Sequence, residues 1–182
     1  MNQVWEGRAW TLGHDVPNDE GLMPLAMTRA QEYRLEILAK HCFEQILPAF
    51  TAEAKPGDIV VAGRNFGHGN PHIQGFLGLK GRGVGLVIAS ISRGPLRACI
   101  NAGVPLLQLR NALQVCENGD LLRVNWRSGR VENLRTGKVF DAPPMPALMR
   151  DIVQAGGGIG YMVQRLREAA LQGNPQQEGD TP

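Results

Sequence analysis

The segment Gly63-Arg-Asn-Phe-Gly-His-Gly-Asn-Pro-His-Ile-Gln74 decides how this chain folds. It follows a short apolar run, Ile59–Ala62, and it precedes residues 73–80, whose composition favours a short helix. Its glycines permit positive φ angles and a close approach of ligands to the backbone. We therefore predict a strand-to-helix turn whose unpaired N–H groups suit a carboxylate or a phosphate. Asn70 and Pro71 are predicted to be the N-cap and the first residue of the helix.

The chain before this segment combines a strand, a turn-rich loop and helical stretches. Val4–Leu12 carries β-formers and aromatic residues and is predicted to be the first strand. His14–Gly21 is rich in turn residues and must be a loop. A helix is predicted over Thr28–Lys40, opened by a Thr-x-x-Gln capping box. Its continuation through Cys42–Leu47 is expected to stop at Pro48.

The chain after the segment first alternates strands with helices and then changes character. Strand Val84–Ile91, helix Arg93–Ala102 and strand Val104–Gln108 follow one another, and the alternation from residue 59 to 108 implies parallel pairing. Three short runs parted by glycine-containing turns then predict a small antiparallel meander. These runs are Leu121–Trp126, Gly129–Asn133 and Lys138–Asp141.

Two further helices, Pro146–Gln154 and Gly160–Leu171, are predicted to close a single α/β domain over residues 1–172. Residues 173–182 are polar and are expected to be a disordered tail. The 182 residues are 43% apolar and 20% charged, which is ordinary globular composition.

Charge and cysteine usage exclude several classes of protein. A net charge of +2 is too weak to indicate nucleic acid or an anionic membrane, and an aromatic fraction of 5% argues against base stacking. We expect no signal peptide, and no apolar run approaches the roughly 20 residues that span a membrane. Its three cysteines are widely separated, so neither a disulfide framework nor a metal motif is expected. We expect a cytoplasmic protein.

The pattern Gly-x-Asn-Phe-Gly-x-Gly before a helix resembles the signature loop of the small subunit of 3-isopropylmalate dehydratase, the swivelling domain of the aconitase superfamily. Further matches occur in the family's order from about residue 7 to residue 168. They include Gly7-Arg-Ala-Trp10, Pro17-Asn18-Asp19, Cys42-Phe43-Glu44, Pro56-Gly57-Asp58, Arg93, Arg97, Asn101, Gly103, Gly119-Asp120 and the glycines at 156–158. The resemblance implies a swivelling β/β/α domain with a parallel-sheet core and an additional antiparallel meander.

The resemblance also implies a function. The family's small subunit closes over a [4Fe-4S] cluster that a separate large subunit holds, and none is bound by this chain alone. The complex dehydrates or isomerises a hydroxy di- or tricarboxylate, as in leucine biosynthesis. In the family, the loop continues Ser-Ser-Arg-Glu-His, where the first serine is the base and the arginine clamps a carboxylate. Here those five positions are Asn70, Pro71, His72, Ile73 and Gln74.

The altered loop leaves His72 as the candidate base. Asparagine has no accessible protonation near neutral pH, so Asn70 cannot replace the serine as a base. His72 can take over proton transfer or act as a weaker carboxylate contact, or it can be a surface histidine without function. His68 either faces the ligand together with Gly69 and Asn70 or packs under the loop. Although His68 and His72 have an H-x3-H spacing, the intervening glycine and proline disfavour a helix, so no metal site is expected.

Acidic and basic side chains complete the predicted site. Asp19 matches an acid that the family places near the reacting centre, although it can also be an Asx-turn residue. Arg97, and next to it Arg93, match helix positions near the loop and can bind a substrate carboxylate, whereas the alternative is a solvated helix face. Arg29 lies in a segment where family members vary with substrate, and it is a candidate for specificity.

Other interpretations of the loop fail on its residues. It lacks the third glycine of a dinucleotide fingerprint, the Gly-Lys-Ser/Thr of a phosphate loop and the Gly-x-Ser-x-Gly of a hydrolase elbow. One rival function remains, namely a catalytically inactive swivelling domain that binds a ligand or a partner. Loss of the serine favours this rival. The enzyme is favoured because an inactive domain need not keep the loop frame and the arginine helix while acquiring two histidines.

Overall fold

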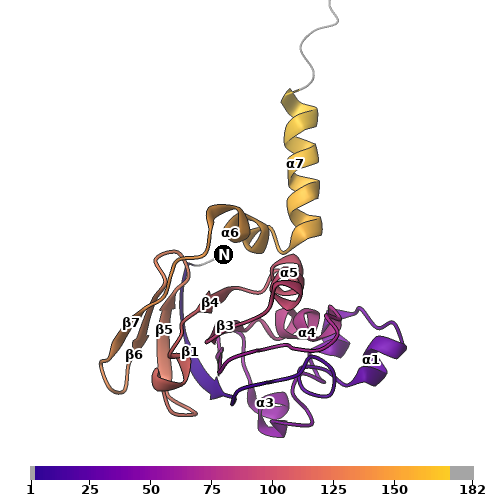
Figure 1. Cartoon of the computed structure of the whole chain (residues 1–182). Helices are drawn as coiled ribbons and strands as arrows, with labels where there is room; N and C mark the ends of the chain where they lie inside the picture. The colour runs from indigo at the N-terminus through magenta and orange to yellow at the C-terminus, as the bar shows by residue number, and fades with distance from the viewer. Residues whose placement is uncertain (1–2, 173–182) are drawn as a thin grey trace, which may run out of the picture.

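The computed structural model describes residues 3–172, which form a seven-stranded sheet with helices packed around it (Figure 1). The strand order is β4-β3-β2-β1-β5-β6-β7. At its centre, β1 (Val4–Thr11) pairs in parallel with β2 (Ile59–Ala62) and antiparallel with β5 (Leu121–Asn125). The predicted α/β class with a parallel core and an antiparallel meander is therefore confirmed.

The parallel half contains β2, β3 (Gly85–Ile88) and β4 (Leu106–Gln108), connected by α4 (Gln74–Arg82) and α5 (Arg93–Ala102). Every residue of β2 and β3 is buried, as expected for strands covered on both faces. Alternate side chains enter two different cores. Val60 and Leu86 pack with the helices, whereas Val61 and Val87 pack with the antiparallel strands.

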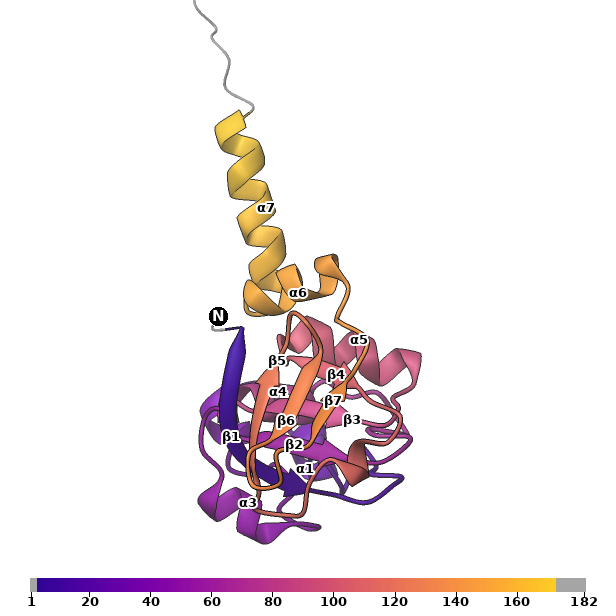
Figure 2. The ribbon, with the colours of Figure 1, turned by 90° about the vertical axis from the view of Figure 1, so that its left-hand side faces the viewer.

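The antiparallel half is the predicted meander, formed by β5, β6 (Arg130–Asn133) and β7 (Val139–Asp141). Together with a short 3₁₀ turn, η1 (Ala112–Gln114), it covers the sheet face opposite the helices (Figure 2). The protein therefore buries both faces of its parallel strands within one chain.

The helix predicted over Thr28–Lys40 is wrong. The structure has two short helices, α1 (Leu25–Arg29) and α2 (Leu35–Leu38), with a turn between them. Gln31 has a φ of 49°, and the Glu32 carboxylate accepts hydrogen bonds from the following backbone N–H groups at 2.8 and 2.9 Å. Local capture of these N–H groups competes with helix propagation. The predicted capping box is also wrong, because α1 begins before it.

Pro48 begins a helix instead of ending one. It is the first residue of α3 (Pro48–Glu53), a position where the missing N–H costs nothing. Residues 42–46 form turns, in which the buried Phe43 has a φ of 55°. Its ring packs edge-on against Phe50 of α3, with ring centroids 5.0 Å apart. Burial of this aromatic pair therefore overrides the helical composition of the segment.

The chain closes with α6 (Ala147–Gln154) and α7 (Gly158–Gln172), close to the predicted bounds. Both views show α7 projecting away from the body of the protein (Figures 1 and 2). Among residues 3–172, no helix has the length and apolar character needed to cross a bilayer. The tail predicted from residue 173 lies outside the described residues.

Candidate active site

Two loops lie side by side at one edge of the sheet, residues 12–24 after β1 and residues 63–73 after β2. Because β1 and β2 are parallel, their carboxyl ends meet at this edge, where ligands of open α/β sheets bind. Backbone hydrogen bonds join the loops, from Gly67 N–H to the Val16 carbonyl at 2.7 Å and from Asn18 N–H to the His68 carbonyl at 2.8 Å. The loops therefore form one unit.

The signature loop is anchored by Asn65 and Phe66. Asn65 has a φ of 60°, and its side chain donates to the Asp15 carboxylate at 3.0 Å. Its backbone N–H donates to the Ser90 hydroxyl, also at 3.0 Å. The Phe66 ring is buried in the main core beside Phe43. The residues that identify the loop are therefore its supports and carry no proton chemistry.

Asn18 is a support that sequence reasoning missed. It is buried, and its side-chain amide donates to the carbonyls of Asn70 at 2.7 Å and His72 at 2.8 Å. The signals in the sequence were its place in the turn-rich stretch before Asp19 and the match of Pro17-Asn18-Asp19 to the family, and neither indicated a buried support. His14 was missed as well, although its Nδ1 accepts a hydrogen bond from the Arg64 N–H at 2.9 Å.

The predicted capping role of Asn70 is wrong. Helix α4 begins at Gln74, with Ile73 as its N-cap and no side-chain cap. The carbonyl of Asn70 instead accepts the Asn18 amide and the His72 N–H. These hydrogen bonds hold residues 70–72 in a turn before the helix. The side chain of Asn70 is exposed.

Asp19 and His72 meet across the two loops. Nδ1 of His72 lies 2.7 Å from Oδ1 of Asp19, and the side chains are 33% and 24% exposed, respectively. An ionised carboxylate only accepts hydrogen bonds, so Nδ1 carries the hydrogen. In the neutral imidazole, Nε2 then holds the free lone pair. Two residues 53 positions apart thus form a carboxylate–imidazole pair with one basic nitrogen remaining.

His68 is oriented by the backbone. Its Nε2 lies 3.0 Å from the carbonyl oxygen of Asp15, which also only accepts, so Nδ1 is left as the acceptor. The neighbouring Gly69 has a φ of 92° and nothing within 4 Å of a Cβ built on it, so this part of the loop is open. Within residues 3–172, no group of three or more His, Cys, Asp or Glu side chains could hold a metal ion.

The predicted arginines differ in their relation to the loops. Arg93 and Arg97 are exposed one turn apart on α5, and a Cβ on the adjacent Gly94 would lie 3.5 Å from Cβ of Pro71. Neither arginine forms an ion pair within the described chain. Arg29 is exposed at the end of α1, and among residues 3–172 no hydrogen bond or ion pair joins its side chain to either loop.

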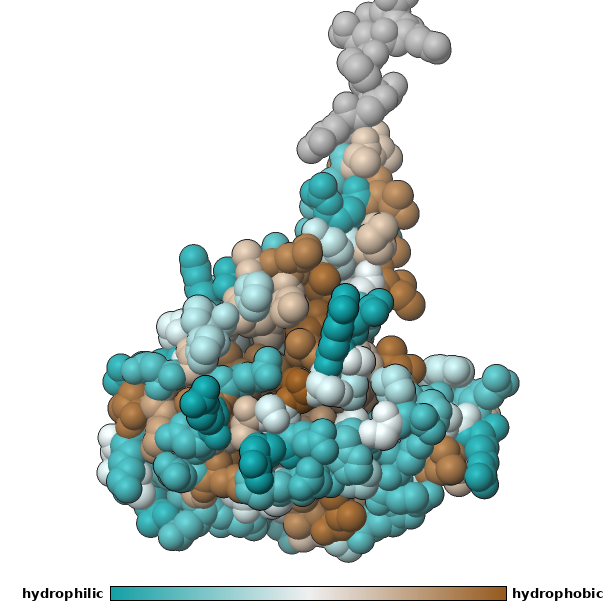
Figure 3. All heavy atoms as spheres, in the orientation of Figure 1, coloured by the Kyte–Doolittle hydropathy of each residue, from teal (hydrophilic) through white to brown (hydrophobic). Residues whose placement is uncertain are grey.

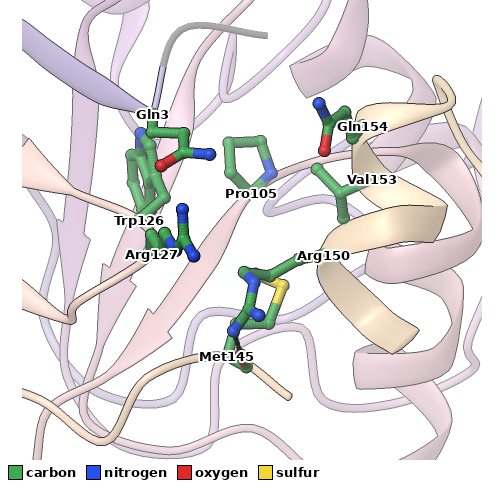
Figure 4. A pocket seen from close by; sticks show the side chains of 8 residues that line it. All are labelled: Gln3, Pro105, Trp126, Arg127, Met145, Arg150, Val153 and Gln154. Atoms are coloured by element: carbon green, nitrogen blue, oxygen red, sulfur yellow. Dashed lines mark hydrogen bonds between the residues drawn. The ribbon is translucent and has the colours of Figure 1, made fainter. Parts of the chain in front are cut away.

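A separate small cavity lies between β5, β4 and α6 (Figure 4). It holds about 40 Å³ and is lined by Trp126, Arg127 and Arg150, among others. None of the predicted site residues lines it. The candidate active site is therefore the pair of loops at the sheet edge.

Known proteins match nearly the whole chain. The isopropylmalate/citramalate isomerase small subunit of Methanocaldococcus jannaschii is 36% identical over 173 residues, covering 93% of this chain and 99% of the relative. The 3-isopropylmalate dehydratase small subunit of Methanosarcina acetivorans is 40% identical over 167 residues, covering 90% and 99%. That of Aquifex aeolicus is 36% identical over 168 residues, covering 91% and 98%.

A solved structure agrees with these relatives. The crystal structure of 3-isopropylmalate dehydratase from Methanocaldococcus jannaschii superimposes with a TM-score of 0.85 at 26% identity. The match covers 93% of this chain and 99% of that one. No family model matches the chain. Because relatives more than 30% identical are covered almost end to end, this chain belongs to the family of 3-isopropylmalate dehydratase small subunits.

Proposed function

We propose that this chain is the small subunit of a two-subunit hydro-lyase of the aconitase type, acting on an isopropylmalate-like hydroxy di- or tricarboxylate. The names of its relatives support the subunit and the reaction class. One observation supports a working site despite the altered loop. His72, which stands where the resemblance puts the family's carboxylate-binding arginine, is paired with Asp19. An inactive domain has no need of an oriented base.

His72 is the general base of the proposal. The dehydration of a hydroxy acid requires removal of a proton from the carbon next to a carboxylate. The Nε2 lone pair of His72 accepts this proton, and the Asp19 carboxylate stabilises the imidazolium that results. In the reverse hydration, the same nitrogen returns the proton. Asp19 acts as a positioning residue, because its contact is with His72 and not with the substrate.

The [4Fe-4S] cluster of the family does not fit this chain. Cys42 and Cys99 are buried in the core, where burial raises the pKa of both thiols, and thiolates are the form that binds iron. Cys116 is half-buried against the core on the other face of the sheet, and burial raises the pKa of its thiol to about 12. The proposal therefore assigns the cluster to a large partner subunit, and none of the steps assigned to this chain passes through it.

The substrate carboxylates are assigned to the arginines of α5. Arg93 and Arg97 are four residues apart and hence on one face of the helix, and Gly94 between them lies beside Pro71 of the loop. A guanidinium binds a carboxylate through two parallel N–H bonds, which a histidine cannot reproduce. His68 and the open backbone at Gly69 and Asn70 are proposed to contact the substrate. Arg29 is proposed to influence substrate choice through the variable segment.

The test is co-expression of this chain with a large subunit, followed by assay of the complex. The cluster is checked by its absorption spectrum, and hydration and dehydration are measured with 3-isopropylmalate, citramalate and longer hydroxy tricarboxylates. We expect turnover with at least one of them. A complex with an intact cluster and no turnover on the whole panel rejects the enzyme and favours a binding module. We also expect the complex to form in the cytoplasm, with neither nucleic acid nor a membrane as a partner.

A further inference from the structure

Among residues 3–172, the close contacts that fix helix α7 to the body lie at its base. Gly156 and Gly157 precede it with φ angles of 83° and 113°. A Cβ on Gly157 would lie 2.4 Å from the Asn101 carbonyl oxygen, so backbone packs directly on the end of α5. Lys80 of α4 donates a hydrogen bond to the Gly156 carbonyl. The direction of α7 is thus set by close contacts, while the remainder of the helix extends into solvent (Figures 1 and 2).

One side of α7 is an exposed apolar stripe. Its members recur at intervals of three and four residues and therefore share one helix face. They are Ile159, Met162, Val163 and Leu166, which are 84%, 56%, 40% and 65% exposed. Figure 3 shows apolar residues along one side of the projecting helix. A contiguous exposed apolar strip on a soluble domain marks an interaction surface.

The stripe forms one wall of a groove whose other wall includes a residue next to the candidate active site in the chain. The groove is open, holds about 510 Å³, and has the α7 stripe as one wall and Ile73 with Asn101 as the other. Ile73 directly follows His72 in the chain. The apolar groove therefore reaches the residue that follows His72 in the chain, although His72 itself does not line it.

We propose that the α7 stripe and its groove are the docking surface for the cluster-bearing large subunit. This inference rests on the proposed function. A partner that completes the site must approach His72, and the groove adjoins it at Ile73. A second copy of this chain seated in the groove would bring its own helix against Ile73 and obstruct that approach. The expected counterpart is an apolar ridge or helix that fills the groove along the i, i+3, i+4 and i+7 positions of α7.

The test compares two leucine-to-glutamate variants of α7. Leu166→Glu places a charge in the stripe, and we expect the affinity for the purified large subunit to fall at least about tenfold. Leu171→Glu is the matched control, because Leu171 is 84% exposed on the same helix but lies about 120° around the axis from Ile159. We expect it to bind like the wild type. Circular dichroism of both variants checks that the fold is intact.

The outcomes separate this inference from the proposed function. Equal affinities of Leu166→Glu and wild type overturn the docking surface even if the complex turns over. A complex that Leu166→Glu weakens, but that acts on no hydroxy acid, supports the docking surface and rejects the proposed activity. If the chain alone forms dimers that Leu166→Glu dissociates, while binding of the large subunit is unchanged, the groove belongs to a second copy. No binding by the wild-type chain rejects both proposals.

Discussion

Nδ1 of His72 lies 2.7 Å from Oδ1 of Asp19, across two loops that follow neighbouring parallel strands. The pair is supported by the buried Asn18, whose side-chain amide donates a hydrogen bond to the carbonyl of His72. Asp19 is the next residue in the chain after Asn18. The same loop therefore supplies both the backbone support and the carboxylate partner of the histidine. This coupling fixes which imidazole nitrogen is free.

Replacement of His72 tests its role as base. We expect His72→Gln to lower kcat of the complex about 10²- to 10⁴-fold, the usual contribution of a general base. Steady-state kinetics on the best substrate of the panel measure it. His68→Gln is the control, because His68 is bound to a backbone carbonyl and is assigned only to substrate contact, so its main effect is expected on KM. A His72→Gln complex as fast as wild type would leave the reaction with a different base.

Replacement of Asp19 tests the orientation of the imidazole. In Asp19→Asn, the side-chain amide can donate to Nδ1, which favours the tautomer with hydrogen on Nε2 and removes the free lone pair there. We expect kcat to fall about 10²-fold or more with little change in KM, and Asp19→Glu to recover part of it. Nitrogen chemical shifts of His72 in the isolated chain report the tautomer directly. Unchanged shifts in Asp19→Asn would contradict the assigned contact.

Much of the fold follows from local pattern. Helix α5 has the predicted bounds, Arg93–Ala102, because Gly103 ends it in the left-handed conformation with a φ of 88°. Strand β2 was predicted from four consecutive apolar residues, which suit a strand covered on both faces. The helix predicted over Thr28–Lys40 and its continuation to Leu47 were wrong because contacts that local pattern does not show decide those segments. In residues 30–34 a glutamate side chain captures backbone N–H groups, and at residue 43 an aromatic ring is buried in the core.

The sequence predicted residues of the candidate site individually, but it did not predict which of them contact one another. The family resemblance indicated Asp19 and His72 separately, but their meeting depends on the parallel register of β1 and β2. Asn18 was missed because an asparagine in a turn-rich segment is most simply a turn residue. Its function as a buried bridge appears only when the two loops are side by side.

A methyl group at Gly75 tests this bridge. A Cβ there would lie 2.8 Å from Oδ1 of Asn18 and 2.9 Å from Cβ of Leu22, so the support under the loop must shift. We expect Gly75→Ala to destabilise the protein by about 1–2 kcal/mol, because the clash outweighs the gain in helix propensity. Urea unfolding measures it. Gly13→Ala is the control, since nothing lies within 4 Å of its Cβ, and we expect a change within about 0.5 kcal/mol. A neutral Gly75→Ala would show that the support is loose.

Acid sensitivity is expected to arise from Asp120, which is not one of the site residues. This buried carboxylate accepts hydrogen bonds from Arg135 at 2.5 Å, Asn133 at 2.8 Å and the Glu117 N–H at 3.0 Å, and the Arg135 guanidinium is the main cause that holds its pKa well below the usual range. A lowered folded-state pKa means that the stabilisation is complete above the ordinary aspartate pKa of about 4. It is lost as the pH falls from there through the folded-state pKa, when the carboxyl binds a proton.

Asp120→Asn should therefore cost about 2–3 kcal/mol of unfolding free energy at pH 7, since it removes charge-assisted hydrogen bonds from a buried group. The loss should shrink as the pH falls below about 4, because wild type then loses the same interaction. Urea unfolding at a series of pH values measures both. Glu117→Gln is the matched control, because its carboxylate contacts the same Arg135 at 3.1 Å but is 83% exposed, and such pairs contribute about 0–1 kcal/mol. If Asp120→Asn and Glu117→Gln cost the same at pH 7, burial is not what gives the Asp120 contact its strength.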